Sequence, residues 1–237
     1  VAKKCTYALK SYADYKAQIL ESQLSGLLLK INGHEVWVKL IGTFNAYNLL
    51  AIYGTAIELG MESLEALRLL SELESVSGRF QYIVSEGNIT AIVDYAHTPD
   101  ALENVLKTIN DIRTKNEQLI TVVGCGGNRD KAKRPVMGGI ASDLSDKAIL
   151  TSDNPRNEDA EVIISEMEQG VAPQNFKRIL SITDRKQAIK TACQLAQPND
   201  IILIAGKGHE TYQEINGVRH DFDDMKIVKE LLEQLHK

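Results

Sequence analysis

The feature that most constrains this fold is a regular alternation of apolar strands and amphipathic helices in the last two thirds of the chain. The strands expected from short, almost wholly apolar runs are residues 89–96, 118–124, 147–153, 176–183 and 200–206. Helices are expected between these runs, at residues 98–112, after the loop 124–135, and at 160–170, 184–196 and 224–237. Near-continuous apolar strands separated by helices predict a mostly parallel α/β sheet that is covered on both faces.

The first third of the chain reads as a smaller, separate region. Residues 25–42 alternate apolar and polar side chains on both sides of the segment NGHE, which predicts a hairpin with a tight turn. Helical spacing of apolar residues follows over 45–60, with Gly60 as a C-terminal cap, and again over 61–73. We expect a domain boundary near residues 77–82, which divides the chain into regions 1–80 and 81–237.

Composition excludes several classes of protein. The hydrophobic fraction of 43% and the charged fraction of 25% are ordinary for a globular protein, and the formal net charge of -5 argues against non-specific nucleic-acid binding. No apolar run reaches membrane-spanning length, and the N-terminus has no signal-peptide core. The three cysteines are far apart, which fits a reducing cytoplasm and indicates neither a metal nor a disulfide framework. The chain has no initiator Met, so we expect it to be part of a longer protein.

Four polar segments each follow one of the expected strands. They are DYAHTPD (94–100), GCGGNRDKAKRP (124–135), TSDNPRNED (151–159) and GKGHETYQ (206–213). The carboxyl ends of parallel strands lie on one edge of a sheet, and ligands bind there in such folds. The sequence therefore predicts a ligand site made of these four segments.

The segment DNPR, residues 153–156, carries the most specific chemistry. Pro155 fixes its own φ and restricts Asn154, so the turn is stiff. Arg156 offers a planar fork suited to a carboxylate, and Asp153 could accept an ammonium group or orient the arginine. The plain alternative is that Asp153 or Asn154 only caps the next helix.

The glycine-rich segment 124–135 is similar to a phosphate-binding turn, although it matches neither GxGxxG nor a Walker lysine motif. Its glycines would let a ligand approach the backbone, and Arg129, Lys131, Lys133 and Arg134 would add positive charge. A solvated basic turn is the alternative.

In the remaining two segments, Glu210 is a candidate acceptor for a substrate ammonium, whereas His209 is expected to be structural. Asp94 could accept hydrogen bonds from ribose hydroxyls, and His97 could contact a phosphate or Asp94 itself. The alternative for this pair is a helix-capping device. Arg79, in the expected linker, could reach a nucleotide phosphate.

Taken in order, the segments LIGTFNAYNLLA, SGRF, VDYAHTPDAL, GCGGNRDKAKRP, TSDNPR, GKGHETYQ and HDFDD resemble the Mur ligase family of peptidoglycan synthesis, in its meso-diaminopimelate-adding type. The resemblance covers essentially the whole chain. It implies that residues 1–80 are the end of the central ATP-binding domain and that residues 81–237 are the C-terminal Rossmann-like domain, which binds the incoming amino acid. The family's GTxGKT loop and magnesium ligands are absent here, so the resemblance implies a fragment.

The resemblance also assigns residues to ligands. For ATP it implies Asn48 at the adenine, Arg79 at the phosphates, and Asp94 with His97 at the ribose. For meso-diaminopimelate the candidate set, with Asp153 added from its place in the turn, is Arg129, Asp153, Asn154, Arg156, Gly206 and Glu210. Asn128 stands where many members carry Asp.

The implied reaction is an ATP- and Mg²⁺-dependent ligation in a cytoplasmic, monomeric enzyme. The carboxylate of the UDP-N-acetylmuramoyl dipeptide becomes an acyl phosphate, and the amine of meso-diaminopimelate attacks it. The expected fragment would be inactive alone. Alternatives are a lysine-adding homologue, a folylpolyglutamate- or cyanophycin-type ligase, and a non-catalytic Rossmann-like binding module; a nicotinamide enzyme fits least.

Overall fold

The computed structural model describes residues 3–237 and divides the chain into two compact units, Val1–Ser75 and Val76–Lys237. The division falls slightly before the boundary that we expected between residues 80 and 81. Within the described part of the chain, no helix is both long and apolar enough to cross a membrane.

The first unit is a four-stranded sheet that carries two helices. Its elements are β1 (Tyr7–Ala8), β2 (Tyr15–Gln23), β3 (Gly26–Ile31), β4 (His34–Val38), α1 (Thr43–Glu58) and α2 (Ser63–Glu72), with strand order β1-β2-β3-β4. The expected hairpin is confirmed, because β3 and β4 pair antiparallel around Asn32 and Gly33, whose φ values are 46° and 94°. Gly60, with φ 91°, ends the first helix as expected.

The second unit is built on a six-stranded sheet with the order β5-β6-β10-β7-β8-β9. Its strands are β5 (Gln81–Val84), β6 (Thr90–Asp94), β7 (Leu119–Cys125), β8 (Lys147–Ser152), β9 (Ile179–Ser181) and β10 (Ile201–Ala205). All neighbouring pairs are parallel except β5 with β6. The predicted mostly parallel α/β sheet is therefore confirmed.

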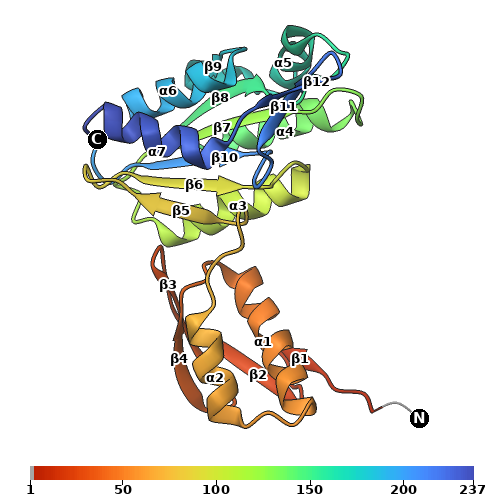
Figure 1. The fold of residues 1–237 in the computed structure, drawn as a ribbon, viewed down its shortest axis with the longest axis vertical. Helices are drawn as coiled ribbons and strands as arrows, with labels where there is room; N and C mark the ends of the chain where they lie inside the picture. The colour runs from red at the N-terminus through yellow and green to blue at the C-terminus, as the bar shows by residue number, and fades with distance from the viewer. Residues whose placement is uncertain (1–2) are drawn as a thin grey trace. The chain divides into compact units, whose positions relative to one another are not determined.

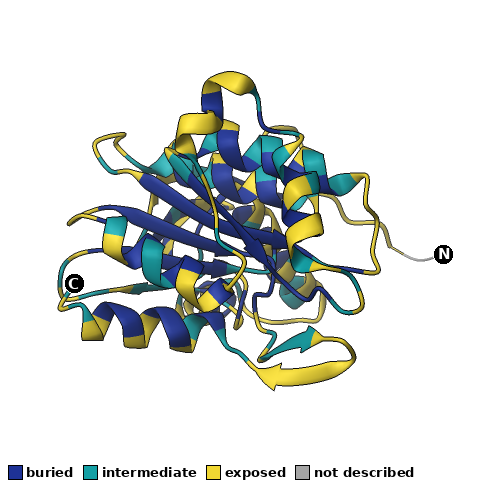
Figure 2. Ribbon diagram, turned by 90° about the horizontal axis from the view of Figure 1, so that it is seen from above, coloured by how far each residue is buried: buried dark blue, intermediate teal, exposed yellow. Residues whose placement is uncertain are grey.

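Helices cover both faces of this sheet (Figure 1). The helices are α3 (Pro99–Ile112), α4 (Lys133–Leu144), α5 (Ala160–Glu168), α6 (Arg185–Leu195) and α7 (Asp224–Gln234). Alternate strand residues such as Val93, Val122 and Ile204 form one core with α6 and α7. Their strand neighbours on the opposite face are buried as well, so both faces are apolar, and Figure 2 shows these strands as almost wholly buried.

Two parts of this unit differ from the sequence-based expectation. The strand expected over 176–183 is only β9, because the 3₁₀ helix η1 (Pro173–Arg178) occupies the start of that segment. An unexpected exposed hairpin, β11 (Tyr212–Ile215) with β12 (Val218–Asp221), turns at Asn216 and Gly217, whose φ values are 49° and 76°. The Asn-Gly pair was the sequence signal for this hairpin.

Candidate functional site

A cleft of about 690 Å³ lies at the carboxyl edge of the six-stranded sheet. All four polar segments contribute to it, so the prediction that they share one edge is confirmed. Its lining includes Tyr95, His97, Arg129, Lys133, Asp153, Asn154, Arg156, Gly206, Glu210 and Tyr212. Basic and acidic side chains therefore border one cavity, which suits a ligand that carries charges of both signs.

The turn after β8 is held by the protein in a strained conformation. Arg156 has a φ of 52°, a region that residues with a side chain rarely adopt. The exposed hairpin stabilises it, because the Arg156 backbone N–H donates to the Glu214 carbonyl at 3.0 Å and its carbonyl accepts from Asn216 N at 2.7 Å. The next helix is capped by Asp159, which accepts from Glu161 N at 2.7 Å. The alternative that Asp153 or Asn154 caps this helix is therefore wrong.

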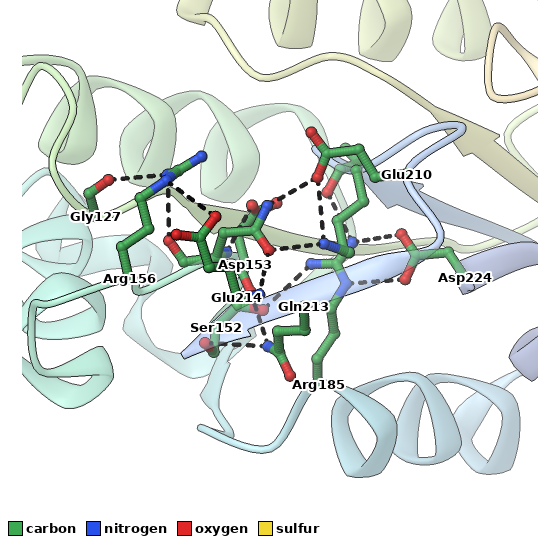
Figure 3. A network of polar contacts seen from close by, with 12 residues as sticks. Gly127, Ser152, Asp153, Arg156, Arg185, Glu210, Gln213, Glu214 and Asp224 are labelled. Atoms are coloured by element: carbon green, nitrogen blue, oxygen red, sulfur yellow. Dashed lines mark hydrogen bonds and ion pairs between the residues drawn. The ribbon is translucent and has the colours of Figure 1, made fainter. Parts of the chain in front are cut away.

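The Arg156 guanidinium is only partly used by internal partners. Its Nη1 donates to the Gly127 carbonyl at 2.9 Å and, more weakly, to the Asn154 carbonyl at 3.4 Å, and its Nε lies 3.9 Å from a Glu214 carboxylate oxygen (Figure 3). Among residues 3–237, Nη2 has no hydrogen-bond partner, and the side chain is 19% exposed at the cleft. The Nη2 group is thus available to an anion.

Glu210 and Asn154 form a hydrogen-bonded pair, and Figure 3 shows Glu210 on the side of the network opposite Arg156. The Glu210 oxygen Oε2 accepts from Asn154 Nδ2 at 2.8 Å, whereas its Oε1 has no hydrogen-bond partner within the described range. The Asn154 side-chain oxygen accepts from Lys207 Nζ at 3.1 Å and from Glu214 N at 2.9 Å. Asn154 therefore holds the Glu210 carboxylate, and the fully buried Lys207 supports both, a contact that the sequence analysis missed.

Asp153 and Gly206 are packed against one another at the base of the cleft. Asp153 is 8% exposed; its Oδ1 accepts from Asn154 N at 2.7 Å, and its Oδ2 is buried without a partner in the part of the chain that the structure describes. Gly206 has a φ of 118°, and a Cβ there would lie 2.7 Å from that Oδ2. Only glycine fits this position, and the orphaned oxygen needs a donor from a ligand or water.

The glycine-rich segment is less basic toward the cleft than its sequence suggests. Arg134 is fully buried and binds Glu158 at 3.0 Å and Glu166 at 2.5 Å, so the expectation that it serves a ligand is wrong. Lys131 also pairs with Glu158, at 3.2 Å. The hydrogen bonds from Arg134 hold the pKa of Glu158 at about 2. Arg129 is exposed in the cleft lining, and Lys133, half-buried there, donates to the His97 carbonyl at 2.7 Å.

Arg129 and Asn128 do not contact each other through their side chains. The Arg129 guanidinium donates to the Asn128 backbone carbonyl at 3.2 Å, and the Asn128 side-chain oxygen accepts from Asn157 N at 3.2 Å. Asn128 has a φ of 52°, which asparagine and aspartate tolerate better than most residues. Residue 128 thus joins the loops after β7 and β8.

The candidates for nucleotide contacts lie in both units. Asn48 is exposed on α1 in the first unit, whereas Arg79, Asp94 and His97 belong to the second. Arg79 stacks on the Tyr95 ring, with its guanidinium carbon 5.0 Å from the ring centre. The four assignments remain predictions.

Asp94 and His97 each have a partner within the protein. Asp94 accepts from Phe80 N at 2.7 Å, and its burial raises its pKa. The His97 ring nitrogen Nδ1 lies 2.8 Å from the Tyr95 carbonyl rather than at Asp94. Both side chains therefore also shape the backbone at the end of β6.

Two of the three cysteines, Cys125 and Cys193, are buried. Burial raises the pKa of both Cys125 and Cys193 to about 12, so neither is a reactive thiolate at neutral pH. No group of three or more histidine, cysteine or carboxylate side chains among residues 3–237 is arranged to hold a metal ion.

The chain is similar to known proteins of one ligase family. The family described as "Mur ligase, glutamate ligase domain" matches residues 78–208. The UDP-N-acetylmuramoyl-L-alanyl-D-glutamate--2,6-diaminopimelate ligase of Cytophaga hutchinsonii is 56% identical, over 100% of this chain and 48% of its own length. A solved structure of a ligase with the same name has a TM-score of 0.72 at 42% identity and covers 98% of this chain and 48% of that one. The chain thus spans about half the length of the relatives it matches.

The fold alone extends to a more distant protein. The UDP-N-acetylmuramate-alanine ligase of Thermotoga maritima has a TM-score of 0.68 at 19% identity and covers 98% of this chain.

Proposed function

The chain belongs to the Mur ligase family, and from this premise we propose that it is the C-terminal part of an ATP-dependent ligase that adds meso-diaminopimelate to UDP-N-acetylmuramoyl-L-alanyl-D-glutamate. The product would be the tripeptide precursor of peptidoglycan. The 56% identical relative bears the name of this activity. We assign residues 1–80 to the end of the central ATP-binding domain and residues 81–237 to the amino-acid-binding domain.

The observation that carries the proposal is the pair of unsatisfied groups in the cleft. Arg156 offers its free Nη2 group, and Glu210 offers one free carboxylate oxygen. Meso-diaminopimelate has two amino-acid ends: the near end, whose amine is acylated, and the far end, which does not react. The far end is itself a zwitterion, with a carboxylate for Arg156 and an ammonium for Glu210. The orphaned Asp153 oxygen supplies a second acceptor for that ammonium. Gly206 keeps the base of the cleft open, and Arg129 adds positive charge at its rim.

This arrangement would deliver the near amine of the substrate to the reaction. ATP supplies the phosphoryl group that activates the dipeptide carboxylate, and the neutral near amine attacks the acyl phosphate, forms the amide and releases phosphate. By holding the far end rigidly, the cleft would lower the entropic part of the barrier; fixing two reactants in register contributes up to roughly 7–11 kcal/mol. We propose that Mg²⁺ would neutralise charge on the ATP phosphates, held mainly by residues outside this chain, since residues 3–237 contain no cluster of metal ligands.

The nucleotide contacts are proposed for the side chains near the end of β6 and for one residue of α1. Arg79 would reach the ATP phosphates, Asp94 and His97 would lie at the ribose, and Asn48 would lie at the adenine. We propose that the protein is a monomer in the cytoplasm, where its three widely spaced cysteines fit a reducing compartment.

The test uses the intact ligase that contains this chain and, in parallel, the 237-residue chain alone. We expect the intact enzyme to convert the UDP-dipeptide in the presence of ATP and meso-diaminopimelate, and to use L-lysine far less well, because lysine has no far carboxylate. We expect no product from the chain alone. A preference for lysine, or for glutamate on a folate substrate, would replace this function with one of the alternatives.

A further inference from the structure

Lys207 is a fully buried lysine in the loop after β10. It lies between Gly206 and Gly208, whose φ values of 118° and 53° turn the chain so that the side chain between them enters the protein. A buried ammonium loses its hydration and is stable only with good partners. The structure must therefore supply those partners, and the reaction described above does not use this group.

The partners of Lys207 are two residues of the amino-acid site. Its Nζ donates to Asn154 Oδ1 at 3.1 Å and to Glu210 Oε2 at 3.3 Å, and it lies 5.6 Å from the centre of the Tyr212 ring. Asn154 Nδ2 in turn donates to the same Glu210 oxygen at 2.8 Å. The three side chains thus form a closed ring of hydrogen bonds, here called the Lys207 ring.

Within the Lys207 ring, Lys207 helps to set the orientation of the Asn154 amide and of the Glu210 carboxylate. The Asn154 oxygen accepts from both Lys207 and Glu214 N, at 3.1 and 2.9 Å, so its amide nitrogen has to face Glu210. Glu210 Oε2 is then occupied by two donors, and Oε1 is the oxygen left toward the cleft. An apolar side chain at position 207 would remove one of the two donors to the Asn154 oxygen and would leave the Glu210 carboxylate without its counter-charge.

We propose that Lys207 is a positioning residue for the far ammonium of the incoming amino acid, acting through Asn154 and Glu210. The proposal rests on the proposed function for the identity of the substrate. Lys207 itself does not touch the substrate in this arrangement. Its contribution is to present a single oriented carboxylate oxygen, which lowers the entropy lost when the ammonium binds.

The test is Lys207→Met in the intact ligase, with two substrates. One substrate is meso-diaminopimelate, and the other is 2-aminopimelate, which keeps the far carboxylate and lacks the far amine. We expect the KM for meso-diaminopimelate to rise at least about tenfold, the size of one lost charge-assisted contact, with kcat changed much less. The KM for 2-aminopimelate should change little. Lys229→Met, at an exposed lysine on α7, is the matched control and should leave both constants unchanged.

A second measurement needs no substrate and separates this proposal from the proposed function. In the 237-residue chain, the side-chain amide signal of Asn154 in NMR spectra should shift and exchange faster with solvent in Lys207→Met than in Lys229→Met. If Lys207→Met does not fold, Lys207→Gln takes its place, since it keeps a donor without the charge. Equal losses with both substrates, or an unchanged Asn154 amide, would overturn the role of Lys207. An intact wild-type enzyme that does not use meso-diaminopimelate would overturn the proposed function alone.

Discussion

Arg185 and Asp224 form a completely buried ion pair directly behind the candidate site. Two parallel hydrogen bonds join them, Nε to Oδ1 at 2.9 Å and Nη2 to Oδ2 at 2.7 Å, and neither side chain is exposed to solvent (Figure 3). The same guanidinium also donates to the carbonyls of Ala205 and Ser152, at 3.1 and 3.5 Å. The pair therefore ties the first turns of α6 and α7 to the ends of β10 and β8, from which the site loops begin.

Asp224→Ala should destabilise the second unit by about 3–5 kcal/mol, because it leaves a buried guanidinium without its counter-charge. Hydrogen exchange of peptides from residues 76–237, measured in the whole chain, gives the change in unfolding free energy. The double variant Arg185→Met/Asp224→Leu removes both charges, and its unfolding free energy should fall clearly less than that of Asp224→Ala. A double variant as unstable as Asp224→Ala would show that the geometry of the pair, not charge compensation, stabilises the region.

Arg156→Lys should raise the KM for meso-diaminopimelate in the intact ligase by roughly 30-fold or more, which corresponds to about 2 kcal/mol, the size of a lost hydrogen bond to a charged group. Lysine keeps the charge but has no planar fork, and the bond that Arg156 donates to Gly127 would also be lost. Steady-state kinetics with varied amino acid give the value. An unchanged KM would remove Arg156 from the site.

Gly127→Ala should be far more disruptive than Gly126→Ala. A Cβ at Gly127 would lie 1.9 Å from the Pro155 carbonyl oxygen, which is backbone, whereas one at Gly126 would meet the movable Arg156 Nη1 at 3.0 Å. We expect Gly127→Ala to lower the unfolding free energy by roughly 1–3 kcal/mol, as for overpacked sites, and to separate the two loops. Gly126→Ala should mainly raise the KM. Thermal unfolding and kinetics of both variants distinguish these outcomes, and equal melting temperatures would contradict this account.

The contribution of Glu158 to the stability of the protein should decrease in acid. Hydrogen bonds from Arg134 lower its pKa from 4.5 to about 2. A carboxyl group with a lowered folded-state pKa stabilises the protein above its unfolded value, and this contribution is lost as the pH falls toward 2. The stability difference between the wild type and Glu158→Gln should therefore shrink between about pH 4.5 and 2. Glu230→Gln, at an exposed position of α7, is the control; hydrogen exchange as a function of pH gives both curves.

Much of the fold could be read from local patterns. The helix expected at 98–112 is α3, which begins at Pro99 after the cap Thr98 and buries Leu102, Val105, Leu106 and Ile109. It was predictable because capping and apolar periodicity act within a few residues. The strand β9 and the hairpin β11–β12 were harder to predict. The strand β9 is short and the hairpin β11–β12 is largely exposed, so neither has the apolar run by which the buried strands were recognised.

By itself, the sequence determined that four polar segments would meet at one edge of a parallel sheet, since strand periodicity and chain direction are local properties. Only the tertiary structure decided which charges are free. Arg134 forms ion pairs with Glu158 and Glu166, 24 and 32 residues away, whereas Arg129 in the same segment stays exposed. Lys207 is buried and donates a hydrogen bond to Asn154, 53 residues away. Such partners come together only when distant loops pack, because an ion pair depends on distance and burial in space rather than on the order of residues along the chain.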